Sequence, residues 1–157
     1  AGIENLFKGK PWVATPNEKT NLDSLHIIKE LAISLGSSWV TTEASIHDQA
    51  VALISHLPVL IGAALLKTVS SEKDPTIVEL AKMLASSGFT DTTRVGAGNP
   101  ELGSSMMENN TAAILHCLDL YKGSLTKLEE KIISKDWIEL QQELETTKNY
   151  RPQFLKE

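Results

Sequence analysis

The segment from about Ala44 to Val69 constrains the fold most, because it is long, has helical spacing and is apolar around most of a helical wheel. The large apolar residues at its centre are Leu53, Ile54, Leu57, Leu60, Ile61, Leu65 and Leu66. A helix that is apolar all round must be covered on every side, and a domain of five or six helices is too small to cover several such helices alone. The segment therefore predicts a helical domain that pairs with a second copy. Pro58 lies inside it and predicts a kink.

Composition excludes several classes of protein. The chain has 157 residues, of which 41% are hydrophobic and 22% charged, as in an ordinary globular domain. Its net charge of −5 offers no basic surface to nucleic acid. The longest wholly apolar run, Leu57 to Leu66, is half the roughly 20 residues of a membrane helix, so we expect no membrane partner. A single cysteine, Cys117, fits a reducing cytoplasm and a buried apolar role.

The first 42 residues have a different pattern from the rest. Trp12–Thr15 and Ser38–Thr42 are short strand candidates, and between them Asn21 or Asp23 can cap a helix that runs to Leu35. Gly36 follows, where a left-handed residue ends a helix. This pattern predicts the last βαβ unit of a larger α/β sheet, because two strands alone cannot bury both faces of a parallel sheet.

From Glu43 onward the pattern is helical. Asp74 and Pro75 are expected to begin a helix that ends at Ser87 and Gly88, followed by a loop from Phe89 to Pro100. Two further helical segments are expected, at residues 100–122 and 124–148.

Polar residues interrupt the apolar segment between His47 and Pro58. On a regular helix Asp48 and Ser55 share a face, whereas His47 and His56 point to opposite sides. One interpretation is a polar seam within a buried helix. The other is the polar lining of a cleft, in which histidine and aspartate orient a substrate or each other.

Arg94 lies in a segment rich in glycine and threonine, which also allows two interpretations. It is either a solvated surface cation or an anion clamp whose planar guanidinium binds a carboxylate in two places. Threonine hydroxyls at 90, 92 and 93 and glycines at 96 and 98 favour the clamp. Gly96-Ala97-Gly98 is no dinucleotide fingerprint, because Glu101 replaces the third glycine.

Several strings of residues, taken in order, resemble the prephenate/arogenate dehydrogenases of tyrosine biosynthesis. They are His47-Asp48-Gln49-Ala50-Val51-Ala52 with Ser55-His56-Leu57-Pro58, then residues 85–94 (ASSGFTDTTR), and then Asn99-Pro100 with Asn110. Residues 5–7 (NLF) and 13–16 (VATP) also resemble the segment after that family's catalytic histidine.

The resemblance implies a fold and an activity. Residues 1–42 would be the tail end of a nucleotide-binding Rossmann domain. Residues 43–157 would be an all-helical dimerisation and substrate-binding domain, similar to the C-terminal domain of 6-phosphogluconate dehydrogenase. The family forms homodimers and oxidatively decarboxylates arogenate to tyrosine, or prephenate to 4-hydroxyphenylpyruvate, with NADP or NAD. By this resemblance the proton-accepting histidine and the nucleotide loop lie upstream of Ala1, so we expect no catalytic or cofactor-binding residue in this chain.

The resemblance also assigns residues. Arg94 matches an arginine that binds a substrate carboxylate, and His47, Asp48, Ser55 and His56 match the helix that organises the substrate. Prephenate-specific members often have histidine where this chain has Val59, and many members have tryptophan where it has Gly103. Both departures resemble the arogenate-preferring, NADP-linked bacterial branch. The alternative is a non-catalytic helical dimerisation module that binds an aromatic amino acid as a regulator.

Overall fold

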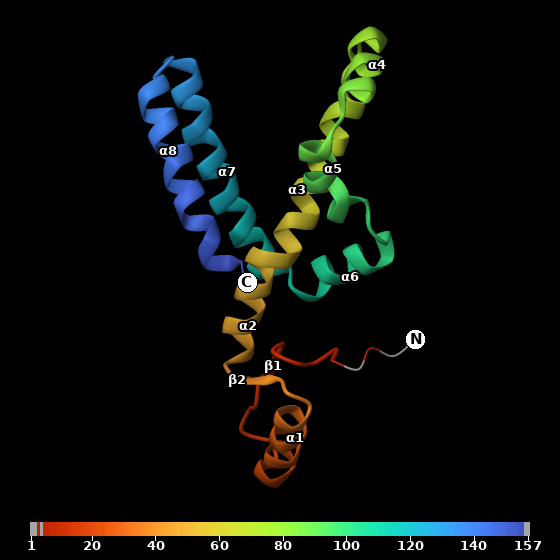
Figure 1. The fold of residues 1–157 in the computed structure, drawn as a ribbon, viewed down its shortest axis with the longest axis vertical. Coiled ribbons are helices and arrows are strands. Elements are labelled where there is room, and N and C mark those ends of the chain that lie inside the picture. Colours follow the sequence, from red (N-terminus) through yellow and green to blue (C-terminus); the bar gives the residue numbers. More distant parts are fainter. Residues whose placement is uncertain (1–2, 4, 156–157) are drawn as a thin grey trace. The chain divides into compact units, whose positions relative to one another are not determined.

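The computed structural model describes residue 3 and residues 5–155. The chain divides into two compact units, one made of the described residues up to Ile114 and one of those from Leu115 onward. Helices dominate both units, which confirms the expectation of a mainly helical chain (Figure 1).

The first unit begins with a small parallel sheet. Strand β1, Pro11–Ala14, pairs with β2, Ser38–Thr41, and helix α1, Leu22–Ser34, connects them. The Asn21 side chain caps α1 by accepting a hydrogen bond of 2.8 Å from the Ser24 amide, and Gly36 follows the helix with a φ of 80°. The predicted βαβ unit is therefore confirmed, and the cap is Asn21 and not Asp23.

The long apolar segment is helical throughout but not regular. Helix α2, Ala44–Val51, passes into a π-helical turn, η1, Ala52–His56, and then into α3, Leu57–Ser70. In η1 the Leu57 amide donates to the Ala52 carbonyl five residues back. Pro58 follows directly; it has no N–H, and its ring would collide with the Ile54 carbonyl in a regular α-helix. The sequence predicts a kink at Pro58, and the structure has a π-turn directly before the proline.

By length and composition alone, the helical segment Ala44–Ser70 could also cross a membrane. The same two properties are found in helices that are covered by other protein helices. Much of the segment is uncovered within this chain, and Leu53 and Ile54 are 48% and 66% exposed.

The next segment differs from the prediction. Helix α4, Pro75–Leu84, begins at its Asp74 cap as expected, but it ends earlier than predicted. The predicted loop instead contains helix α5, Ser87–Thr93, and a 3₁₀ turn, η2, Arg94–Ala97. The hydroxyls of Thr90, Thr92 and Thr93 each donate to a carbonyl four residues earlier in this segment, at 2.7–3.1 Å. These hydroxyls therefore donate within their own segment and are not free donors for an anion.

The predicted helix at residues 100–122 is broken at Asn110, whose backbone leaves the helical region with φ −134° and ψ 32°. Helix α6, Pro100–Asn109, precedes the break, and α7, Thr111–Ile133, follows it. Asparagine has poor helix propensity, and here its side chain is bonded outside its own helix.

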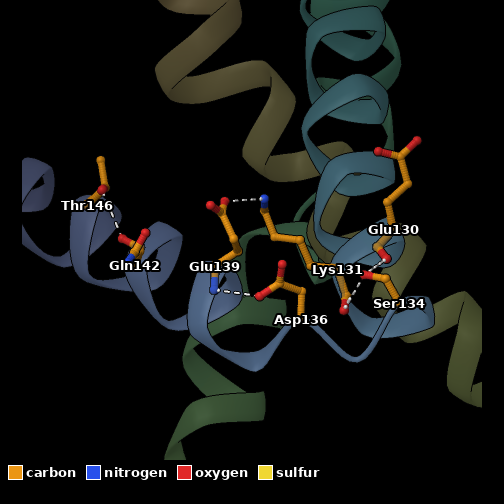
Figure 2. Close-up of polar contacts among 7 residues, drawn as sticks. All are labelled: Glu130, Lys131, Ser134, Asp136, Glu139, Gln142 and Thr146. Carbon is orange, nitrogen blue, oxygen red and sulfur yellow. Dashed lines mark hydrogen bonds and ion pairs between the residues drawn. The ribbon is translucent and has the colours of Figure 1, made fainter.

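In the second unit, α7 is followed by α8, Trp137–Tyr150, and a short 3₁₀ turn, η3, Arg151–Phe154. Figure 2 shows the polar contacts at the turn between α7 and α8. Asp136 caps α8 by accepting from the Glu139 amide at 3.0 Å, and the Lys131 Nζ lies 3.3 Å from the Glu139 Oε2. Lys135 adopts a positive φ of 57° at this turn.

Few large apolar side chains are buried in the part of the chain that the structure describes. The buried apolar residues are Ala32, Ala52, Leu57, Ile114 and Cys117. Many large apolar residues are half exposed or more, among them Ile77, Leu80, Met83 and Leu84 of α4. Soluble monomers rarely leave so much contiguous apolar surface open, so this pattern is typical of a chain with a protein partner.

Candidate functional site

The π-turn decides which side chains meet. In a regular α-helix nine residues correspond to a rotation of about 180°, which would place His47 and His56 on opposite sides. A π-turn acts as one inserted residue, so the rotation between the two histidines falls to about 80°. The prediction that they point apart is therefore wrong, and the two histidines line the same hollow.

This hollow, which we call the histidine hollow, has a volume of about 400 Å³ and lies where α2 and η1 face α6. Its lining residues are His47, Asp48, Val51, Ser55, His56, Leu102, Ser105, Met106, Asn109 and Asn110. The structure thus brings together four of the five predicted site residues, which favours the cleft over a buried polar seam.

Hydrogen bonds orient the polar groups of the hollow. The His47 Nδ1 lies 3.1 Å from the Asp48 Oδ1. Because a carboxylate only accepts, the hydrogen of this bond belongs to the His47 Nδ1. On the other side, the Asn110 Nδ2 donates to the Asp48 carbonyl oxygen at 2.7 Å and lies 3.3 Å from the His56 Nδ1. Asn110 therefore connects α2 and η1 to the break between α6 and α7.

Ser55 and Asp48 place further polar atoms in the hollow, beside the exposed Ser105 and Asn109 of α6. Ser55 is exposed, and its hydroxyl makes no hydrogen bond with another described residue. The Asp48 side chain is 51% exposed and the His47 side chain 38% exposed, so a ligand can reach both. The arrangement offers a hydroxyl, a carboxylate and two imidazoles to a small polar ligand.

Arg94 does not line the histidine hollow. It is exposed in η2, and no hydrogen bond or ion pair joins its side chain to another described residue. Its neighbours Val95 and Gly96 line a second hollow of about 180 Å³, which shares Leu102 and Met106 with the first. Arg94 itself lines neither hollow, although its two neighbours in the chain line the second one.

The second hollow is lined by Val59 and Gly103, the two positions at which the sequence departs from the patterns it resembles. Val59 is half-buried in α3, and a Cβ added at Gly103 would meet nothing within 4 Å. A larger side chain at either position would reach into this space. Neither residue has a polar side chain, so the second hollow has an apolar wall where a histidine would supply a donor.

Gly96 has a packing role. A Cβ at this position would overlap the backbone of Gly62 and Ala63 in α3 and would lie 2.8 Å from the Gly62 Cα. Gly96, which the sequence analysis connects with an anion clamp, therefore approaches α3 and not an anion. It fixes η2, and with it the backbone of Arg94, against α3.

Asn110 is a residue of this hollow to which the sequence alone assigns no role. Its position inside a predicted helix is the available signal, because a short amide side chain there competes with helical hydrogen bonds. Among the described residues, no group of three histidine, cysteine, aspartate or glutamate side chains could hold a metal ion. Cys117 is buried, as expected for a packing residue.

Residues 43–146 match the family described as the dimerization domain of prephenate dehydrogenase. The cyclohexadienyl dehydrogenase of Zymomonas mobilis is 33% identical over 136 residues, which are 87% of this chain and 46% of that protein. The solved structure of Synechocystis arogenate dehydrogenase is 43% identical with a TM-score of 0.91, over 96% of this chain and 54% of that one.

A second solved structure, prephenate dehydrogenase from A. aeolicus in complex with hydroxyphenyl propionate and NAD+, is 27% identical with a TM-score of 0.89. It covers 98% of this chain and 53% of that one. The chain thus spans about half the length of the relatives it matches. The helical fold described above agrees with this match. The family match over residues 43–146 shows that the chain belongs to the prephenate dehydrogenase family and carries its dimerization domain.

Proposed function

We propose that this chain forms the substrate-binding and dimer-forming part of an arogenate dehydrogenase, which oxidatively decarboxylates arogenate to tyrosine. The observation that carries the proposal is the histidine hollow, in which His47, Asp48, Ser55 and His56 converge in a chain of this family. In the proposed arrangement residues 1–42 belong to a nucleotide-binding domain and residues 43–157 to the helical domain.

The four polar residues are proposed to position the substrate. Ser55 and His56 offer donors to its oxygens, and the Asp48 carboxylate, held by His47, attracts a cationic group. Arg94 is proposed to clamp a substrate carboxylate, because its guanidinium is exposed and has no partner among the described residues.

Arogenate is preferred over prephenate in this proposal because of Val59 and Gly103. Prephenate carries a keto oxygen, which accepts hydrogen bonds, where arogenate carries an ammonium group, which donates them. Val59 offers no donor to a keto oxygen. The 43% identity to Synechocystis arogenate dehydrogenase supports the same choice.

The nicotinamide cofactor is proposed to be NADP, bound by residues outside this sequence. The described residues do not fit a dinucleotide, because Gly96 packs against α3 and the sequence has no glycine-rich fingerprint after a strand. The solved structure of the A. aeolicus relative contains NAD+. This chain covers 53% of that protein's chain.

Steady-state kinetics of the full-length protein tests the proposal. We expect a higher kcat/KM with arogenate than with prephenate, and with NADP than with NAD. The isolated 157-residue chain should neither bind NADP nor turn over either substrate. Dehydrogenase activity in the isolated chain, or none with either substrate in the full-length protein, would contradict the proposal.

A further inference from the structure

Asn110 joins three parts of the first unit through one amide group. It ends α6, its Nδ2 donates to the Asp48 carbonyl oxygen at 2.7 Å, and the same nitrogen lies 3.3 Å from the His56 Nδ1. The residue is half-buried, and it lines the histidine hollow. The two contacts cross 62 and 54 residues of sequence, so the fold brings this amide to the site.

The chemistry of these groups fixes where the hydrogens lie. A backbone carbonyl only accepts, so the nitrogen of the Asn110 amide, and not its oxygen, must face Asp48. The second hydrogen of that nitrogen is then directed to the His56 Nδ1, which must accept it with its lone pair. A neutral imidazole has one donor and one acceptor, so the His56 Nε2 carries the ring hydrogen.

His47 has the opposite arrangement. Its Nδ1 faces the Asp48 carboxylate at 3.1 Å, so its hydrogen is on Nδ1 and its Nε2 is an acceptor when the ring is neutral. The histidine hollow thus contains one imidazole that donates through Nε2 and one that accepts through Nε2. The His56 Nε2 makes no hydrogen bond with any other described residue, so it is free for a ligand.

We propose that Asn110 is a positioning residue that holds His56 as the Nε2–H tautomer, so that His56 donates a hydrogen bond to an oxygen of the substrate. This inference rests on the proposed function for the identity of the substrate. The tautomer of His56 is independent of the proposed function, because it follows from the Asp48 carbonyl and the Asn110 amide. A purely structural Asn110 would connect α6 to α2 without controlling the hydrogen on His56.

The tautomer is measured directly in the full-length wild-type protein labelled with ¹⁵N-histidine. In a neutral imidazole the ¹⁵N shifts of the two ring nitrogens distinguish a bare nitrogen from a protonated one. We expect hydrogen on Nε2 of His56 and on Nδ1 of His47, with His56→Gln identifying the His56 signals. Hydrogen on the His56 Nδ1 would overturn the inference, and this experiment needs no variant of Asn110.

Asn110→Asp tests the positioning role. A carboxylate at this position only accepts, so it favours the Nδ1–H tautomer of His56 and leaves Nε2 without a hydrogen. We expect the ¹⁵N pattern of His56 to reverse and KM for the ring substrate to rise about ten-fold, the effect of one lost hydrogen bond, with KM for NADP unchanged. Asn21→Asp is the matched control, because aspartate caps α1 equally well, and it should change neither quantity.

The outcomes separate this inference from the proposed function. If the wild-type protein turns over neither arogenate nor prephenate, the proposed function is wrong, and the wild-type tautomer alone decides the role of Asn110. If the enzyme is active but Asn110→Asp keeps both the wild-type ¹⁵N pattern and the wild-type KM, Asn110 is a structural connector and the inference is wrong. If Asn110→Asp does not fold, the position of the hydrogen in the wild-type spectrum supports or overturns the inference by itself.

Discussion

Gly96 and Gly62 meet backbone to backbone where the turn η2 crosses helix α3. The contact leaves no room for a Cβ at Gly96, because the overlapping atoms belong to the backbone of α3 and cannot rotate away. We expect Gly96→Ala to lower the free energy of unfolding by roughly 1–3 kcal/mol, the usual cost of overpacking. The midpoint of urea denaturation measures it.

Gly123→Ala is the control for this prediction. Gly123 lies inside α7, and an added Cβ would meet nothing within 4 Å. Alanine in a helix interior is more stable than glycine by roughly 0.5–1 kcal/mol, so this variant should be slightly more stable than wild type. Two variants of equal stability would mean that the Gly96 contact does not constrain η2.

Arg94 is expected to contribute to substrate binding and not to the stability of the fold. Its side chain is exposed and unpaired among the described residues, so removing it breaks no internal contact. In the full-length enzyme Arg94→Ala should lose about ten- to several-hundred-fold in kcat/KM, mostly through KM, because each bond to a charged group contributes about 1.5–3 kcal/mol. Arg94→Lys should recover only part, since a point charge does not reproduce the planar fork. A variant that unfolds but binds substrate normally would assign Arg94 a structural role.

Val59→His tests the choice between substrates. The imidazole would extend into the second hollow and could donate to the keto oxygen of prephenate. One such bond contributes about 0.5–1.5 kcal/mol, so the ratio of kcat/KM for prephenate over arogenate should rise up to about ten-fold. Val59→Leu, which adds volume without a donor, should leave the ratio unchanged. A ratio that moves equally in both variants would reflect a steric effect only.

Pro58→Ala is expected to weaken the π-turn. An N–H at this position can donate to the Ile54 carbonyl, which favours a regular α-helix and rotates His56 away from His47. We expect KM for substrate to rise about three- to ten-fold as one positioned hydrogen bond weakens, with no loss of thermal stability. Pro152→Ala, in the exposed turn η3, serves as the control. An unchanged KM would show that Pro58 is not what maintains the π-turn.

The exposed apolar surface predicts a dimer. Met83 and Leu84 of α4 are 82% and 70% exposed, and the segment before α3 is similarly uncovered at Leu53 and Ile54. We expect a homodimer that buries more than about 2,000 Å², as obligate dimers do. Sedimentation velocity at micromolar concentration should give a dimer for the wild type and a shift towards monomer for Leu84→Glu, with Lys19→Glu in an exposed turn unchanged. A monomeric wild type would contradict the prediction.

Local chemistry makes part of the fold predictable. The Asn21 cap, Gly36 after α1 and the Asp74-Pro75 start of α4 depend on neighbouring residues only, and these elements lie where the sequence predicts them. The segment around Arg94 is predicted as a loop because glycine and threonine are poor helix formers. In the structure the threonine hydroxyls are bonded to carbonyls of α5, and Gly96 packs against α3, a contact between distant residues that local propensity does not reveal.

The candidate site is predictable only in part, because it too depends on contacts between residues that are distant in the sequence. His47, Asp48, Ser55 and His56 are close in sequence, and the family resemblance selects them together. Their common orientation depends on a π-turn, which regular periodicity does not reveal, so the prediction that the two histidines point apart fails. The role of Asn110 depends on contacts with Asp48 and His56, which are 62 and 54 residues away, and no local pattern indicates them.

The π-turn has a further consequence for how this stretch of the gene can change. A π-turn contains one residue more than a regular α-helix needs, so deleting one residue between Ala52 and Ser55 would leave eight α-helical steps between the two histidines. Eight steps give a rotation of about 80°, the same as the π-turn gives now, so both histidines would still line one hollow. A substitution that makes the turn regular without removing a residue would instead leave nine α-helical steps and place the second histidine on the opposite side of the helix. In this part of the chain, the in-frame loss of a single codon is therefore less damaging to the site than a missense change that removes the π-turn.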